Sequence, residues 1–408
     1  MKHTVVFLLI ICLLLGSCAE QNPEPEMTTV PSAAATLPPT EAPTAPPATD
    51  PPKQPPTEAT EPPTEPPTEP PITLTLPELL LQRMTTEEKV GQLFLARCPD
   101  IAAAEDAATY HLGGYILFGR DFEDRTHEEV VDNIASYQAA AGIPMFIAVD
   151  EEGGIVCRVS SYFRDSRFPS PRTLYDRGGM KLILATEAEK IDLLQSFGIN
   201  VNLAPVCDVT TDPDAFMYSR SLGQSPEETG RVIASMVKLM NRSQFGCVLK
   251  HFPGYGNNTD THVGIAIDDR SLDELESGDL IPFAKGIDAG AKAIMVSHTF
   301  VNCLDTEYPA SLSPAVIEYL RNTMGFGGVV ITDDLAMEAI TDLYGAEESA
   351  VLAVLAGNDL LCSSEYWIQY PAVLEAVESG RISAEILDAA VLRILNWKYS
   401  MGILDNLT

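Results

Sequence analysis

The sequence predicts a single (β/α)₈ barrel that follows a long disordered linker. After about residue 73, short apolar segments alternate with helical patterns eight times, which is typical of a barrel closed on itself. Polar residues stand at the ends of several apolar segments, where a barrel places its active site. The segment before the alternating part lacks the apolar content of a core. An open doubly wound sheet is the alternative, but it would not need eight units.

The N-terminus predicts a lipoprotein signal peptide over residues 1–18. Lys2 supplies a positive charge, and the apolar run that follows it is short for a membrane span but suits a signal peptide. Residues 15–18, Leu-Gly-Ser-Cys, resemble the bacterial lipobox, so Cys18 is the predicted lipidation site. The alternatives are an ordinary signal peptide and an uncleaved anchor. We expect the protein to be anchored by lipid at the extracellular face of the bacterial cytoplasmic membrane. Location in the cell wall and release from the cell are the alternatives.

Residues 19–72 predict a disordered linker rich in Pro, Thr, Glu and Ala. Proline favours extended polyproline II, and glutamates repel one another. At ~3.1 Å per residue the segment could reach on the order of 150 Å. It is either a spacer that holds residues 73–408 away from the membrane or a tolerated linker without function.

Charge and cysteine content narrow the classes of partner and cofactor. The net charge of -32 argues against nucleic acid, because a phosphate backbone repels such a surface. No cysteine pair has CxxC or zinc-ligand spacing, and several cysteines lie in apolar runs. We therefore expect no metal or organic cofactor, and mostly free, buried thiols at Cys98, Cys157, Cys207, Cys247, Cys303 and Cys362.

Eight apolar segments are the predicted parallel strands, since strands buried on both faces are nearly continuously apolar. They are Leu93–Cys98, Tyr115–Phe118, Met145–Val149, Val201–Pro205, Cys247–His251, Ala293–His298, Val329–Thr332 and Asp359–Cys362. Helical patterns between them include Pro226–Arg242, Pro314–Met324 and Ala346–Ala356. The strand ends carry Asp150, Asp208, Lys250 with His251, His298 and Asp333, and we expect these residues to converge on one face of the barrel.

The segment from Lys250 to His262 combines most of the predicted chemistry. A buried strand delivers Lys250 and His251 to its end, and Pro and Gly residues then shape a sharp loop. Asp260 lies two residues before His262. A carboxylate that close can fix the tautomer of the imidazole and raise the basicity of its other nitrogen.

The second informative segment, residues 328–337, is an apolar strand that ends in two acids. Asp333 stands at the strand tip and can point into the barrel mouth, where a carboxylate is a reasonable nucleophile for an anomeric carbon. Asp334 is predicted to cap the following helix.

On these motifs the chain resembles glycoside hydrolase family 3, in its β-N-acetylglucosaminidase branch. The Lys-His-Phe-Pro-Gly loop ending in Asp-Thr-His is the most specific of them, and the resemblance extends from Leu81 to about Tyr399. It implies that Asp333 is the nucleophile and that His262, oriented by Asp260, is the acid/base. It also implies a sugar pocket made by Asp150, Arg158, Arg220, Lys250 and His251.

The expected activity is that of a retaining exo-β-N-acetylglucosaminidase, acting through a covalent glycosyl-Asp333 intermediate on peptidoglycan-derived oligosaccharides such as muropeptides. A histidine acid would not repel phosphate, so a phosphorylase that uses the same residues is an alternative. A non-catalytic wall-binding lipoprotein is another. We expect a monomer that is held at the membrane by its N-terminal lipid.

Overall fold

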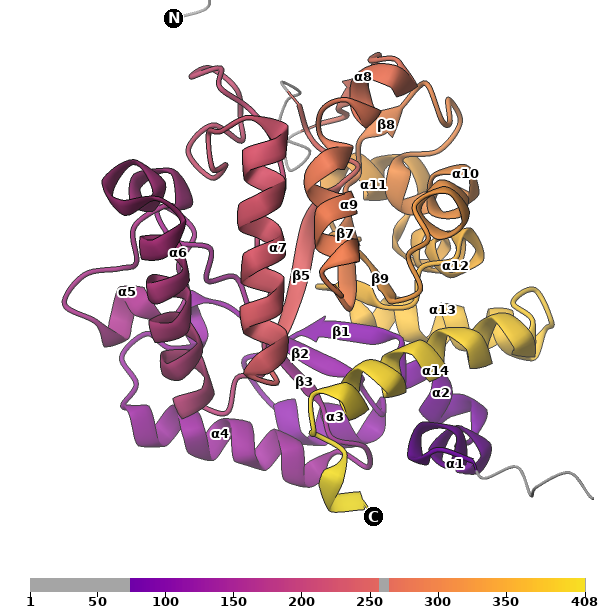
Figure 1. Ribbon diagram of the computed structural model, residues 1–408. Coiled ribbons are helices and arrows are strands. Elements are labelled where there is room, and N and C mark those ends of the chain that lie inside the picture. The colour runs from indigo at the N-terminus through magenta and orange to yellow at the C-terminus, as the bar shows by residue number, and fades with distance from the viewer. Residues whose placement is uncertain (1–73, 257–263, 408) are drawn as a thin grey trace, which may run out of the picture. The chain divides into compact units, whose positions relative to one another are not determined.

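The computed structural model describes residues 74–256 and 264–407, and these residues form a parallel β-barrel surrounded by helices (Figure 1). The strands run in the order β10-β1-β2-β3-β4-β5-β7-β9, and a parallel bridge between Ile331 and Leu360 joins β9 to β10. The barrel strands are β1 (Phe94–Arg97), β2 (Gly114–Leu117), β3 (Phe146–Val149), β4 (Val201–Asn202), β5 (Gly246–Phe252), β7 (Ala293–Val296), β9 (Val329–Thr332) and β10 (Leu361–Ser363).

All eight predicted strands are therefore confirmed, with ends that move by a few residues. The largest difference is β4, predicted as Val201–Pro205, which has regular pairing only over Val201–Asn202. Pro205 has no N–H to donate, so the ladder to β5 continues irregularly, through the Lys250 N–H bond to the Pro205 carbonyl at 3.2 Å and a bridge at Val206.

The helices lie outside the strands (Figure 1). Two predicted helices are confirmed to the residue, Pro226–Arg242 (α7) and Ala346–Ala356 (α12). The predicted helix Pro314–Met324 divides into α10 (Pro314–Glu318) and a π-helical turn at Tyr319–Thr323. The helices are α1 (Leu76–Arg83), α2 (Thr86–Gln92), α3 (Ala103–Thr109), α4 (His127–Ala140), α5 (Ser160–Phe163), α6 (Pro171–Ser196, interrupted at Gly179), α7 (Pro226–Arg242), α8 (Leu272–Glu276), α9 (Leu280–Asp288), α10 (Pro314–Glu318), α11 (Glu338–Tyr344), α12 (Ala346–Ala356), α13 (Tyr366–Glu378) and α14 (Ala384–Ser400).

Short elements complete the fold. They are the 3₁₀ turns Gly119–Asp121, Ala310–Leu312 and Asp405–Leu407, and a parallel pair of two-residue strands, β6 (Ile267–Asp268) and β8 (Phe300–Val301). Among the described residues, no helix is both long enough and apolar enough to span a bilayer.

The barrel closes through a side chain as well as through the backbone. Asp359 is 1% exposed, and its carboxylate accepts the Val330 N–H at 2.8 Å. Arg321 and Arg393 both form ion pairs with the same carboxylate. A buried carboxylate is tolerated when it is paired and hydrogen-bonded in this way. Asp359 thus reinforces the β9–β10 junction, where the strand pairing is shortest.

The six cysteines from Cys98 to Cys362 are all free, and all but Cys303 are buried, as the sequence predicts.

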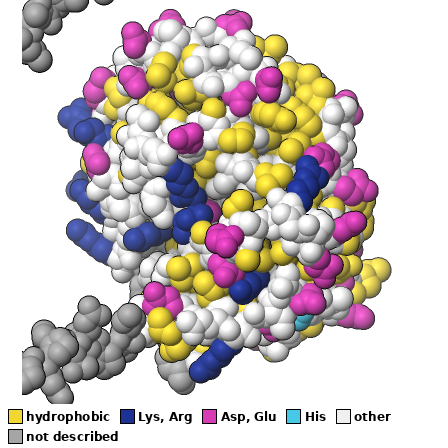
Figure 2. All heavy atoms as spheres, turned by 90° about the vertical axis from the view of Figure 1, so that its right-hand side faces the viewer, with side chains coloured by type: hydrophobic (Ala, Val, Ile, Leu, Met, Phe, Trp, Pro, Cys, Tyr) yellow, Lys and Arg dark blue, Asp and Glu magenta, His cyan; other side chains and the backbone are white. Residues whose placement is uncertain are grey.

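On the face shown in Figure 2, acidic side chains are scattered among hydrophobic and uncharged ones, and most Lys and Arg side chains gather along one side.

Lys398 on α14 is fully buried beneath the barrel, and its ammonium donates to Gln92 Oε1 at 2.7 Å. Burial lowers the pKa of Lys398 to about 7, whereas an unfolded lysine has a pKa of about 10.4. Above pH 7 the unfolded chain therefore binds more protons at this site, and stability rises with pH until both forms are neutral.

Because of this lysine, we expect the free energy of unfolding to be about 2 kcal/mol higher at pH 9 than at pH 7. Urea denaturation of the wild type and of Lys398→Met at both pH values measures the contribution, because other titrating groups cancel in the difference. An identical pH dependence in the two proteins would contradict the lowered pKa.

Candidate active site

A cavity of about 350 Å³ opens at the carboxyl ends of the barrel strands. Six of the predicted site residues line it together: Asp150, Arg158, Arg220, Lys250, His251 and Asp333. Asp260 and His262, the predicted acid/base pair, lie outside the described residues, as does the predicted lipidation site Cys18. His298, another strand-end residue, does not line the cavity and instead contacts Ser311 Oγ and the Asp334 carbonyl.

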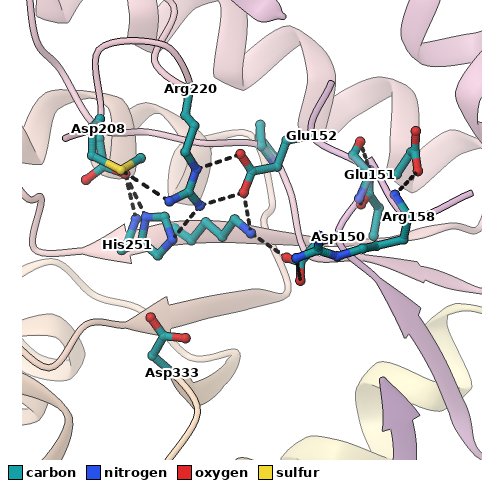
Figure 3. A network of polar contacts seen from close by, with 12 residues as sticks. Asp150, Glu151, Glu152, Arg158, Asp208, Arg220, His251 and Asp333 are labelled. Carbon is teal, nitrogen blue, oxygen red and sulfur yellow. Dashed lines mark hydrogen bonds and ion pairs between the residues drawn. The ribbon is translucent and has the colours of Figure 1, made fainter. Parts of the chain in front are cut away.

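Lys250 is the cation at the centre of the site (Figure 3). It comes from β5 and is 2% exposed, and its Nζ lies 2.7 Å from both Asp150 Oδ1 and Glu152 Oε1. Burial alone lowers the pKa of Lys250, but the two carboxylates outweigh it, so the net shift is upward. The side chain is thus held as a charged ammonium that can donate hydrogen bonds to a ligand.

Glu152 is a site residue that the sequence did not reveal. Its carboxylate receives a bidentate pair from Arg220, with Nε to Oε2 at 2.9 Å and Nη2 to Oε1 at 2.7 Å, and it also contacts Lys250. Burial raises the pKa of Glu152, but the two cations outweigh burial and hold the pKa well below its usual range. Glu152 is therefore an ionised bracket that fixes Arg220 and Lys250 relative to each other.

His251 is held in one tautomer by its neighbours. Its Nδ1 lies 2.8 Å from Asp208 Oδ2, and its Nε2 lies 3.2 Å from Arg220 Nη2. Arginine has only donors, so Nε2 must accept, and Nδ1 must then carry the proton that is donated to Asp208. Asp208 also accepts the N–H groups of His251 and Tyr255. His251 therefore links Asp208 to Arg220 and helps to orient the guanidinium, and Asp208 gains a definite role.

Asp333 faces this network across the cavity, from the tip of β9 (Figure 3). Its backbone N–H donates to the Val296 carbonyl at 3.0 Å, which continues the pairing with β7. Its carboxylate oxygen Oδ1 accepts the N–H of Asp334 at 2.9 Å. The strand geometry thus delivers a carboxylate to the side of the cavity opposite the Lys250–Glu152–Arg220 cluster.

The prediction that Asp334 caps the next helix is wrong. Helix α11 begins after Met337, which is its N-cap and makes no side-chain capping bond. The Asp334 carboxylate instead accepts the N–H groups of Ala336 and Ser364, each at 3.0 Å, and the Ser364 hydroxyl. Two intervening turn residues place the helix out of its reach, so Asp334 ties the β9 turn to the end of β10.

Arg158 is positioned by a neighbouring buried acid. Glu151 is 0% exposed, and its Oε2 accepts the N–H groups of Arg158 and Val159, each at 2.8 Å. This loop places the Arg158 guanidinium 3.9 Å from Asp150 Oδ2, an ion pair longer than a hydrogen bond. Of the three consecutive acids, Glu151 anchors the loop, whereas Asp150 and Glu152 both line the cavity and both contact Lys250.

No cluster of three or more His, Cys, Asp or Glu side chains within residues 74–256 and 264–407 has the arrangement of a metal site. The cavity instead combines four carboxylates, contributed by Asp150, Glu152, Asp333 and Asp334, with four cations, contributed by Arg97, Arg158, Arg220 and Lys250. Such a lining offers many directional hydrogen bonds to a small polyhydroxylated ligand.

Comparison with known proteins agrees with this geometry. Residues 85–397 match the model of the glycosyl hydrolase family 3 N terminal domain. The beta-hexosaminidase LpqI of Mycobacterium tuberculosis is 32% identical over 341 residues, which cover 79% of this chain and 84% of that protein.

Two solved structures are similar over most of the barrel. A family 3 beta-N-acetylglucosaminidase from Paenibacillus sp. str. FPU-7 has a TM-score of 0.74 and 33% identity, covering 78% of this chain but 63% of the longer Paenibacillus chain. The M. tuberculosis LpqI structure has a TM-score of 0.72 and 30% identity, covering 80% and 97%. With a matching family model, relatives at this level of identity and a shared barrel, the chain belongs to glycosyl hydrolase family 3 and is a glycoside hydrolase.

Proposed function

We propose that this chain is a retaining exo-β-N-acetylglucosaminidase, which releases terminal N-acetylglucosamine from oligosaccharides. The observation that carries the proposal is the placement of Asp333 across one small cavity from the Asp150–Lys250–Glu152–Arg220 network. The relatives named as beta-hexosaminidases support the specificity. At about 350 Å³ the cavity is near the lower end of ligand-pocket sizes, about 300–1,000 Å³, which suits one sugar ring and hence exo cleavage.

In the proposed mechanism Asp333 attacks the anomeric carbon while the bond to the leaving oxygen breaks. His262 gives that oxygen a proton, with Asp260 orienting the imidazole. The covalent glycosyl-Asp333 intermediate is then hydrolysed by a water that the neutral His262 deprotonates. An imidazole has a pKa of about 6.5, which suits both proton transfers near neutral pH. The network of cations and carboxylates holds the sugar hydroxyls and the acetamido group in place for the attack.

We further propose that the enzyme is lipid-anchored through Cys18 outside the cytoplasmic membrane and acts on peptidoglycan fragments. The signal-peptide pattern and the Pro-rich linker of residues 19–72 support this location. Expression of the full chain and of Cys18→Ala in a Gram-positive host, followed by fractionation, tests the anchor. The wild type should be found in the membrane fraction. The variant, which lacks the cysteine that carries the lipid, should be missing from that fraction.

The activity is tested by incubating the purified protein with 4-nitrophenyl β-N-acetylglucosaminide and following the first-formed sugar by NMR. The proposal predicts free N-acetylglucosamine that appears first as the β-anomer. Sugar 1-phosphate formed in phosphate buffer would assign a phosphorylase instead. Binding of chitobiose without any product would point to a non-catalytic wall-binding protein.

A further inference from the structure

Arg97 is a cation of the cavity that the proposed mechanism does not use. It is the last residue of β1 and lines the same cavity as Asp333. Its Nε is buried and has no hydrogen-bond partner within the part of the chain that the structure describes. Lys250 and Arg220, by contrast, each lie 2.7 Å from a carboxylate oxygen. A buried donor without a partner carries a desolvation cost, which a ligand could offset.

Phe118 brings Arg97 and Arg158 together. The guanidinium carbons of the two arginines lie 4.6 Å and 5.5 Å from the centroid of the same Phe118 ring. The Nε of Arg158 is also buried without a partner among the described residues, and its nearest carboxylate oxygen is 3.9 Å away. Guanidinium groups stacked on an aromatic ring are held in place while their N–H edges stay available, an arrangement suited to oxyanions.

The nearby carboxylates leave these donors unused. Asp150, the carboxylate nearest to Arg158, is paired with Lys250 at 2.7 Å and lies 3.9 Å from the Arg158 guanidinium, beyond hydrogen-bond reach. The oxygens of Asp334 accept from Ser364 and Ala336. The Arg97–Phe118–Arg158 cluster thus presents two cationic side chains whose buried Nε–H groups have no acceptor among the described residues. An anion at this position would accept from them.

The order of the strands places this cluster at one end of the bound sugar. In a closed ring of eight strands, β1 lies opposite β5, and β9 lies midway between them. Under the proposed function, on which this step rests, Asp333 of β9 attacks the anomeric carbon, and the leaving group is assigned to the β5 side because its proton donor, His262, follows β5 in the chain. The wall made by β1 and β2 then faces the end of the non-reducing sugar remote from the cleaved bond.

We propose that Arg97 and Arg158 form a subsite for an anionic substituent, a sulfate, phosphate or carboxylate, on the non-reducing sugar at its 4- or 6-position. The guanidinium edges donate charge-assisted hydrogen bonds to this group, while the Phe118 ring holds them in place. The subsite makes Arg97 a determinant of which sugars are accepted, and it takes no part in bond cleavage.

The test compares kcat/KM for 4-nitrophenyl β-N-acetylglucosaminide with kcat/KM for its 4-sulfate and 6-sulfate. One sulfated substrate should be cleaved by the wild type. The ratio of the sulfated to the neutral value should then fall about 10- to 100-fold in Arg97→Met, as expected for loss of a charged hydrogen bond. Arg381→Met is the matched control, because Arg381 pairs with Glu348 at the surface, neither residue lines the cavity, and the loss of this pair should leave the ratio unchanged.

A third substrate carries a neutral sugar and a carboxylate-bearing aryl aglycone, and so separates the two ends of the site. A loss in Arg97→Met confined to this substrate would overturn the placement of the subsite. An unchanged ratio, or a wild type that cleaves neither sulfated substrate, would overturn the inference while leaving the proposed function intact. Failure to cleave the neutral substrate would instead contradict the proposed function. If Arg97→Met folds poorly, Arg97→Lys takes its place. This variant keeps the charge without the planar group, so it should retain part of the ratio.

Discussion

Asp333→Ala should lower kcat/KM for an aryl β-N-acetylglucosaminide by about 10⁴-fold or more, the scale seen when a nucleophile is removed from an enzyme. The reason is that the Asp333 side chain faces the cation network across the cavity, whereas the carboxylate of Asp334 is hydrogen-bonded by Ser364 and Ala336. Initial rates of 4-nitrophenol release give the measurement.

Added azide distinguishes a lost nucleophile from a damaged fold. A small anion can occupy the space of the missing carboxylate and attack the anomeric carbon from the same side, so Asp333→Ala should regain turnover and release the inverted α-glycosyl azide. Asp342→Ala is the matched control, because Asp342 lies in the same strand–helix unit but is exposed on α11. A variant at position 333 that keeps a tenth of wild-type activity would remove Asp333 from the mechanism.

The strands were predictable because their signal is local. Segments such as Val329–Thr332 are continuously apolar and buried, as strands covered on both faces are. The pair β6 and β8 has two residues in each strand, and Ile267 is exposed, so no apolar run marks it. The π-helical turn that ends α10 was equally invisible, since the side-chain pattern of Pro314–Met324 stays helical throughout.

The sequence could predict only those site residues whose role follows from their position at the end of a strand. Asp150, Lys250 and Asp333 stand at or just past strand ends, and the cavity brings them together. The distinct roles of Glu151 and Glu152 depend on which way each side chain turns after the strand has ended, and three adjacent acids look alike in sequence. The role of Asp208 likewise depends on the approach of β5, through His251, from 43 residues away in the chain.

Lys250→Met should lower kcat/KM by about 10- to 100-fold, because the sugar loses a charged hydrogen-bond donor, which typically contributes about 1.5–3 kcal/mol. Lys250 Nζ separates Asp150 from Glu152, and its removal leaves two acids facing each other with less positive charge between them. Steady-state kinetics at pH 7 measure the loss. Lys89→Met is the control, since Lys89 pairs with the half-exposed Asp388 at the surface and such a pair contributes about 1 kcal/mol or less.

The stability deficit of the same variant should also depend on pH. In the wild type Lys250 helps hold the pKa of Glu152 low, so without it that pKa moves upward in the folded protein. A lowered carboxyl pKa contributes stability that is present above the unfolded pKa of about 4.3 and is lost as the pH falls through the folded pKa, and the variant loses part of this contribution. The Tm deficit of Lys250→Met should therefore be larger at pH 7.5 than at pH 3.5.

The double variant Lys250→Met/Glu152→Gln separates the two roles of the lysine. Removing one of the facing carboxylates should restore much of the lost Tm at pH 7.5, because the electrostatic cost disappears with it. It should not restore kcat/KM, because the sugar still lacks the ammonium donor and Arg220 has lost its bidentate partner. Recovery of activity together with stability would show that Lys250 serves only to neutralise charge and does not bind the substrate.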